Sequence, residues 1–177
     1  MNKKKTAKLL MALKIPSKQE WAIYGNTSPE IVYALATKLG PNGHVHLVDK
    51  LKNKLVALKI DPSTMAEVSL LQKDFTVSKL FDDLDGIVFP YSLHSVKNPL
   101  KVLAQTMLST KPNGKIIVLD FETRRANPWI KYPVGYKRLA FLANKLDLPE
   151  PKILAKTNSR FGRKSYLAEI IIPDLRS

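Results

Sequence analysis

The stretch DGIVFPYSLHSVKNPLKVLAQTMLSTKPNGKIIVLDFE, residues 85–122, determines the fold class of this chain. Its two apolar runs, 85–90 and 115–121, have the length and composition of buried parallel strands. Between them, 99–110 has apolar side chains at helical spacing, and 111–114 has the proline, asparagine and glycine of a turn. The expected apolar side of this helix comprises Leu100, Leu103, Ala104, Met107 and Leu108. A strand, a helix and a second strand form one βα unit, so the stretch predicts an α/β fold with a mostly parallel sheet.

The same alternation of patterns continues on both sides of this stretch. Strands are expected at 20–25, 44–49, 68–72, 152–157 and 165–172, and helices at 28–39, 51–60 and 134–145. The first of these helices has a clear start. Ser28 can cap it, Pro29 fits its first position, and Glu30 places an acid in its first turn.

Length and composition fit one globular domain. The chain has 177 residues, of which 45% are hydrophobic and 25% charged. The domain is expected to span 20–177, behind a basic extension over 1–19 that includes a short amphipathic helix at 6–15. The absence of cysteine excludes a disulfide framework, a cysteine-ligated zinc site, an iron–sulfur cluster and a cysteine nucleophile. No apolar run approaches the roughly 20 residues that span a bilayer, so we expect a soluble, cytoplasmic protein.

Positive charge is concentrated in two segments. The net charge is +14, from 29 Lys and Arg against 15 Asp and Glu. Residues 1–20 have six lysines and one glutamate, a net +5, and residues 124–164 have eleven basic and two acidic residues, a net +9. This asymmetry favours an anionic partner such as RNA, a phosphorylated metabolite or an acidic surface. Solvated faces of a lysine-rich protein are the equally weighted alternative.

Three segments, in this order, resemble one known family. Residues 85–122 contain LHSVKNP and then KPNG before a strand, which resembles the "LHHV-x-x-P" and "L-K-P-G-G" stretches of ubiquinone/menaquinone-type methyltransferases. GPNGHVHLVDK, at 40–50, resembles the second strand of that family, which ends in an acid. Residues 127–172 resemble its substrate-side loop, last crossover helix and terminal hairpin. From residue 20 onward the chain therefore resembles the class I S-adenosylmethionine (SAM) dependent methyltransferases.

The resemblance implies a Rossmann-like sheet of seven mostly parallel strands in the order 3-2-1-4-5-7-6, with the last strand antiparallel and helices on both faces. It also implies SAM bound beyond the carboxyl ends of the strands, at the switch point beside the first strand. The residues that match cofactor-binding positions are Gly25, Asn26, Asp49, Lys50, Asp74, Phe75, Pro90 and Tyr91. Asp49 is expected to bind both ribose hydroxyls, and Asp74 and Phe75 to lie near the adenine. The alternative for each acid is an ordinary loop residue after a strand.

The chain departs from the family at the end of the first strand, where the pattern is D-x-G-x-G-x-G. Ile23 replaces the acid, Gly25 matches the first glycine, and Thr27 and Pro29 replace the other two. Ile23 lacks the carboxylate that helps to place the SAM ammonium group in the family, a contact of about 1.5–3 kcal/mol. Two hypotheses follow. The chain is a SAM-dependent methyltransferase for an unknown, anionic substrate, or a related domain that has lost SAM and binds RNA or a complex through its basic segments.

One histidine is a candidate catalytic residue. His94 follows the fourth strand, where the family often has a residue that faces the reaction, and an imidazole there could act as a general base. Packing under the adjoining helix is the alternative role. His44 and His46 share one strand face, but no third ligand is evident, so they are expected to be structural and no metal site is expected.

Aromatic and basic residues are interleaved after the fifth strand. They suit stacking on a base with phosphate contacts, or a lid whose aromatic rings fold onto the core while its cations face water. The candidate substrate- or anion-binding residues are Arg124, Arg125, Trp129, Lys131, Tyr132, Tyr136 and Arg138.

Overall fold

The computed structural model describes residues 8–11, 13–25, 27–51, 59–158 and 164–174. Its strands are β1 (Glu20–Tyr24), β2 (His44–Val48), β3 (Glu67–Leu71), β4 (Leu84–Pro90), β5 (Thr110–Phe121), β6 (Lys152–Asn158) and β7 (Lys164–Ile171). They form a seven-stranded sheet in the order β3-β2-β1-β4-β5-β7-β6. Neighbouring strands are parallel from β3 to β5, whereas β7 is antiparallel to β5 and β6. The predicted fold class and strand order are confirmed.

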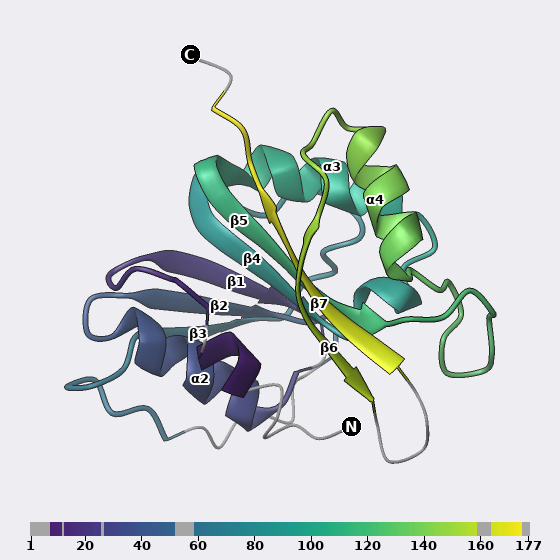
Figure 1. Cartoon of the computed structure of the whole chain (residues 1–177). Helices are drawn as coiled ribbons and strands as arrows, with labels where there is room; N and C mark the ends of the chain where they lie inside the picture. The colour runs from purple at the N-terminus through teal and green to yellow at the C-terminus, as the bar shows by residue number, and fades with distance from the viewer. Residues whose placement is uncertain (1–7, 12, 26, 52–58, 159–163, 175–177) are drawn as a thin grey trace.

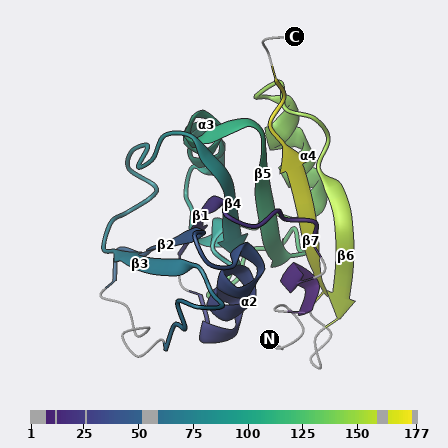
Figure 2. The same cartoon turned by 90° about the vertical axis from the view of Figure 1, so that its left-hand side faces the viewer.

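Helices cover both faces of the sheet, as predicted (Figures 1 and 2). Helix α2 (Pro29–Leu39) packs on one face, and α3 (Pro99–Ser109) and α4 (Tyr136–Asn144) pack on the other. A short 3-10 helix, η1 (Leu93–Ser95), connects β4 to α3. Each face of the sheet has its own apolar cluster. The domain therefore has three layers, helix, sheet and helix, with one cluster between each pair of layers.

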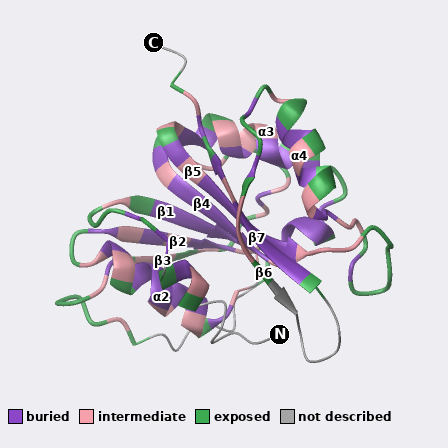
Figure 3. Cartoon of the chain, in the orientation of Figure 1, coloured by how far each residue is buried: buried purple, intermediate pink, exposed green. Residues whose placement is uncertain are grey.

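Strand β1 illustrates how the sequence directs side chains to the two faces. Trp21 and Ile23 belong to the cluster under α2, whereas Ala22 and Tyr24 belong to the cluster under α3 and α4, because successive side chains of a strand alternate. All four are buried, and Figure 3 shows the same burial along the central strands. The carboxyl end of β1 is therefore fixed from both faces, beside β2 and β4.

The N-terminal segment adds to the core. Residues 8–11 are helical, within the helix predicted at 6–15. Leu10, Leu13 and Ile15 are all less than 9% exposed and belong to the cluster under α2. Lys115 of β5 donates from Nζ to the carbonyl of Lys14 at 3.1 Å, which ties this segment to the sheet. The helix predicted at 51–60 lies largely outside the described residues.

Helix α3 buries a face that matches the prediction only in part, since Leu103 is buried as expected. Leu108 is 65% exposed and Leu100 also faces solvent, while Thr106 and Ser109 are buried. The hydroxyl of Thr106 donates to the Val102 carbonyl at 2.8 Å, and Ser109 bonds the backbone of its own helix in the same way. These local bonds satisfy the hydroxyls, so polar residues can face the core. The positions of the apolar residues alone therefore did not predict the whole buried face of α3.

The turn predicted at 111–114 lies within strand β5. Leu84 of β4 pairs with Thr110, and Gly86 pairs with Lys115, so a bulge absorbs the extra residues of β5. Asn113 adopts a left-handed φ of 63° in this bulge, and its N–H donates to Ile172. The turn residues thus bend a continuous strand instead of separating the strand from α3.

Candidate functional site

The carboxyl ends of β1, β2 and β4 meet around Gly25. Its φ of 93° is a left-handed backbone conformation that favours glycine. Its N–H donates to the carbonyl of Val48, the last residue of β2, at 2.8 Å. A Cβ at position 25 would lie 2.6 Å from Cβ of Ser92, which follows β4. Glycine is therefore required for this close approach at the switch point, where open α/β sheets bind ligands.

Three buried hydroxyls belong to the segments that follow β1 and β4 at this junction. Ser28 and Ser92 are 2% and 5% exposed, and the Oγ1 atom of Thr27 is also buried. None of the three hydroxyl groups has a hydrogen-bond partner among the described residues. Ser28 occupies the predicted N-cap position of α2, but its side chain makes no capping bond. Because buried polar groups nearly always have partners, these hydroxyls are suited to a polar ligand.

Asp49 directly follows β2, as predicted. Its N–H donates to Leu71 at the end of β3, at 3.1 Å. Its Oδ1 accepts the N–H of Leu51 at 2.9 Å, so the carboxylate closes the turn after the strand. Its second oxygen has no hydrogen bond to the described residues.

Asp74 and Lys50 approach each other across the ends of β2 and β3. Lys50 Nζ lies 4.0 Å from Asp74 Oδ2. Asp74 Oδ1 accepts both the hydroxyl and the N–H of Thr76, at 2.6 and 2.9 Å. The Thr76 hydroxyl holds the pKa of Asp74 below its usual value. The structure thus places Asp49, Lys50 and Asp74 at one edge of the site, with Asp74 committed to a local turn.

Two other positions of the predicted site are filled by core packing. Phe75 is 8% exposed, stacks on Tyr24 with ring centroids 5.0 Å apart and meets Phe89 edge-on. Ile23, at the position of the family acid, is fully buried in the cluster under α2. Both side chains therefore pack against protein, and Asn26 lies outside the described residues.

The chain bends sharply where β4 ends. Pro90 is buried as the last residue of the strand, and Tyr91 has a left-handed φ of 55°. Such a conformation is costly for a bulky residue and is frequent at functional sites. The N–H of Tyr91 donates to Leu119 at 2.7 Å, and its ring lies against Phe121. This bend directs the following residues, including His94, along the carboxyl edge of β5.

His94 is held by a buried carboxylate. Its Nδ1 lies 2.7 Å from Oδ1 of Asp120, and its backbone N–H donates to Oδ2 at 2.9 Å. Asp120 is fully buried in β5, while the His94 side chain is 10% exposed. The ring of Phe121 meets the imidazole edge-on at 5.1 Å. In the tautomer whose Nδ1–H donates to the carboxylate, Nε2 is the acceptor nitrogen, and no described residue bonds to it.

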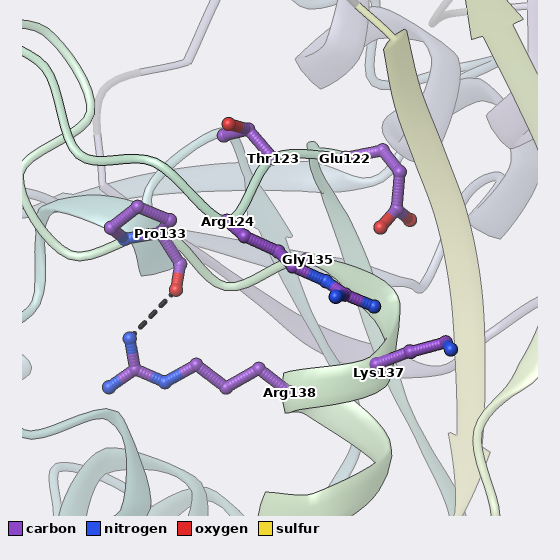
Figure 4. A pocket seen from close by; sticks show the side chains of 7 residues that line it. All are labelled: Glu122, Thr123, Arg124, Pro133, Gly135, Lys137 and Arg138. Carbon is purple, nitrogen blue, oxygen red and sulfur yellow. Dashed lines mark hydrogen bonds between the residues drawn. The ribbon is translucent and has the colours of Figure 1, made fainter.

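A cavity of about 180 Å³ opens between the end of β5 and the start of α4 (Figure 4). We call it the β5–α4 pocket; it is lined by Glu122, Thr123, Arg124, Pro133, Gly135, Lys137 and Arg138. Two predicted anion-binding residues, Arg124 and Arg138, line it together with Lys137. Gly135, at the N-cap of α4, has no side chain that could cap the helix. Glu122 takes that role, since its Oε2 accepts the N–H of Tyr136 at 3.2 Å.

The remaining predicted anion-binding residues do not line this pocket. Arg125, Trp129 and Lys131 are exposed on the loop, with Trp129 71% exposed. The N–H of Tyr132 donates to the His94 carbonyl at 2.9 Å. Tyr136 Oη turns away and donates to the Pro151 carbonyl at 2.8 Å. The structure therefore brings only Arg124 and Arg138 of this set together in the pocket.

His44 and His46 make structural contacts. Their rings stack at 4.2 Å, and each has a nitrogen 2.9 Å from Ser69 Oγ. His46 Nε2 also lies 2.6 Å from Glu20. In the described ranges, no group of three His, Cys, Asp or Glu residues could hold a metal ion. The helices of the described chain are also too short or too polar to cross a membrane.

Comparison with known proteins agrees with this topology. No family model matches the chain. A demethylmenaquinone methyltransferase of Renibacterium salmoninarum is 25% identical over 152 residues, which are 85% of this chain and 60% of that protein. A SAM-dependent methyltransferase from Aquifex aeolicus superposes with a TM-score of 0.67 at 16% identity, covering 97% of this chain and 89% of the other. The chain has the class I methyltransferase fold.

Another structure with this methyltransferase fold was solved with ligands. It is a 1,6-didemethyltoxoflavin N1-methyltransferase from Burkholderia thailandensis, with bound 1,6-didemethyltoxoflavin and S-adenosylhomocysteine. It superposes with a TM-score of 0.71 at 15% identity, covering 98% of this chain and 79% of that one. The likeness establishes the shared methyltransferase architecture.

Sequence reasoning missed three residues of this candidate site. Asp120 is a single acid at the carboxyl end of an apolar strand, and that position is a signal for a functional carboxylate. Glu122, two residues later, caps α4 and enters the pocket. Ser92 has no sequence signal, because only the tertiary structure brings it against Gly25.

Proposed function

We propose that this chain is a SAM-dependent methyltransferase. The observation that carries the proposal is the set of buried, unpartnered hydroxyls of Thr27, Ser28 and Ser92, on the segments that follow β1 and β4 and meet at the left-handed Gly25. A polar ligand at this junction would satisfy groups that otherwise stay unpaired at a cost of about 1–3 kcal/mol each. The position at the sheet switch point supports a nucleotide-like ligand.

The chemistry of the residues at the junction suits SAM, with hydroxyl groups in place of the family carboxylate. Asp49 would bind the ribose hydroxyls through the carboxylate oxygen that makes no hydrogen bond to the described residues, which supports the proposal. The hydroxyls of Thr27, Ser28 and Ser92 would bind the methionine end, in place of the carboxylate that Ile23 lacks. When bound, SAM supplies an electrophilic methyl group on its sulfonium.

His94 is the proposed general base. Asp120 holds the imidazole through Nδ1 and fixes its orientation, so Nε2 can take the proton that a hydroxyl or amine acceptor loses as it is methylated. Asp120 acts as a positioning residue, because its oxygens are occupied by N–H groups of His94 and Phe121. Buried walls keep bulk water from most of the imidazole.

Calorimetric titration with S-adenosylhomocysteine and with SAM tests the cofactor site. We expect binding in the wild-type chain, weakened about 10- to 100-fold in Asp49→Asn through loss of a charge-assisted hydrogen bond. The amide preserves an oxygen for Leu51 N–H, so the turn should remain. Asp61→Asn is the matched control, because Asp61 Oδ1 accepts the N–H of Ser63 in the same kind of turn on the surface. Equal affinities in wild type, Asp49→Asn and Asp61→Asn would show that Asp49 does not bind the cofactor.

Absence of binding at millimolar ligand would overturn the proposal and favour the alternative, a basic module for RNA or a complex. If SAM binds, the role of His94 as general base can be tested next. The measurement is the rate at which the protein converts SAM to S-adenosylhomocysteine when a small-molecule extract supplies the methyl acceptor. His94→Gln is expected to lower that rate by about 10²–10⁴ while leaving cofactor affinity unchanged. An unchanged rate would leave His94 with a packing role only.

A further inference from the structure

The β5–α4 pocket has the size of a binding site for one chemical group. Its volume is about 180 Å³, below the roughly 300–1,000 Å³ of pockets that enclose whole ligands. Its two walls come from the end of β5 and the start of α4. Part of a larger molecule could therefore enter it while the remainder lies outside.

Its lining carries an excess of positive charge. Arg124, Lys137 and Arg138 face one acid, Glu122. Arg138 donates from Nη1 to the Pro133 carbonyl at 2.8 Å, which fixes its guanidinium at the rim. Arg124 and Lys137 extend to the same side of the pocket (Figure 4), and within the described part of the chain neither has an ion-pair or hydrogen-bond partner. Two cations are thus left for an incoming anion.

The acid in the pocket is already committed. Glu122 accepts the Tyr136 N–H, and its Oε1 would lie 3.0 Å from a Cβ at Gly135. A carboxylate is stabilised at this end of a helix by the unpaired N–H groups of the first turn. Glu122 therefore serves α4, and the net charge of the pocket stays positive.

Both walls of the pocket adjoin residues that contact His94. Phe121, next to Glu122, packs its ring against the imidazole at 5.1 Å. Tyr132, next to Pro133, donates its N–H to the His94 carbonyl at 2.9 Å. The segments that form the pocket, after β5 and before α4, are therefore the same segments that hold His94 in place.

We infer that the β5–α4 pocket binds the carboxylate or phosphate group of a small-molecule methyl acceptor, through Arg124 and Lys137. The acceptor role rests on the proposed methyltransferase function, whereas anion binding does not. Guanidinium and ammonium groups recognise both oxyanions, and Arg can bind either one in a bidentate manner.

Amide NMR titrations with sodium phosphate and, separately, sodium acetate, at constant ionic strength, test the site. We expect saturable shifts at Thr123, Gly135 and Lys137 for at least one anion, and the anion that binds identifies the group. Arg124→Gln with Lys137→Gln should weaken that affinity about tenfold or more. Arg125→Gln with Lys131→Gln is the matched control, because it removes the same charge from exposed positions outside the pocket and should leave the affinity unchanged.

Three results would overturn the inference. They are no saturable shift for either anion, equal weakening in the two double variants, and competition between the anion and S-adenosylhomocysteine, which would assign the pocket to the cofactor. Phosphate or acetate should instead bind undiminished to protein saturated with S-adenosylhomocysteine. If the pocket binds anions but S-adenosylhomocysteine does not bind, the methyltransferase proposal and the acceptor role fail while the anion site stands. If only S-adenosylhomocysteine binds, the anion site alone fails.

Discussion

The ring of Trp21 in β1 lies directly over Gly86 in β4. The two residues are register partners in the parallel pair, and a Cβ at position 86 would lie 2.5 Å from two carbons of the indole. Trp21 is fully buried and belongs to the cluster under α2. Gly86 therefore makes room for the largest side chain of the strand whose carboxyl end forms the candidate site.

Gly86→Ala is expected to lower the free energy of unfolding by about 1–3 kcal/mol. The added methyl overlaps a rigid, buried ring, and the ring or the strand must move. Urea unfolding followed by circular dichroism measures the loss.

The matched experiment is a double-mutant cycle with Trp21→Phe. Phenylalanine lacks the outer ring carbons that the alanine would meet, so the double variant should lose at least about 1 kcal/mol less than the sum of the single losses. Additive losses would show that the cost at position 86 does not come from the indole.

Two buried tyrosines should make the fold sensitive to alkali. Burial raises the pKa of Tyr24 well above its usual value, and burial, followed by the charges of Asp120 and Glu122, raises the pKa of Tyr166. The folded state then keeps protons that the unfolded chain loses above about pH 10. Stability is therefore intact below pH 10 and falls as pH rises further, by up to about 1.4 kcal/mol per pH unit for each group.

Tyr24→Phe should flatten this decline in urea unfolding measured from pH 9 upward, relative to wild type. Tyr166→Phe should flatten it too, but should also cost about 1 kcal/mol at neutral pH, since Tyr166 Oη donates to the Val134 carbonyl at 2.6 Å. Tyrosinate ultraviolet absorbance recorded alongside reports ionisation directly. An unchanged slope in Tyr24→Phe would contradict the assigned direction of its pKa.

Phe75→Leu distinguishes a core ring from a ligand-stacking ring. Because Phe75 packs on Tyr24 and Phe89, we expect a loss of about 1–2 kcal/mol in urea unfolding. Affinity for S-adenosylhomocysteine should change by less than about threefold. A tenfold loss of affinity with unchanged stability would instead assign the ring to the ligand.

The N-terminal segment should contribute to stability. Leu10 is 1% exposed in the cluster under α2, so Leu10→Ala is expected to cost about 2–4 kcal/mol in thermal or urea unfolding. Met11→Ala is the control, because Met11 is the next residue in the chain and its side chain is 44% exposed. Similar small effects from both substitutions would mean that the segment packs only weakly.

Strong local patterns predicted most of the architecture. The apolar run that became β4 and the Ser28-Pro29-Glu30 start of α2 both correspond to observed elements. On α3 the pattern found the buried Leu103 but missed Thr106 and Ser109, which face the core and satisfy their hydroxyls within their own helix. It also failed at 111–114, which lie within β5 as a bulge between Thr110 and Lys115, the residues that pair with β4.

The sequence by itself determined the succession of strands and helices, through hydrophobic period and turn residues. Its resemblance to the class I methyltransferases implied the order of the strands in the sheet, the place of the switch point and the loss of the family acid at Ile23. Only the tertiary structure decided that Ser92 meets Gly25, that Asp120 holds His94 and that Arg124 shares a pocket with Lys137. The two residues of each pair are far apart in the sequence and belong to different structural elements. Such contacts are fixed by strand pairing and helix packing, which bring distant residues together without leaving a local pattern.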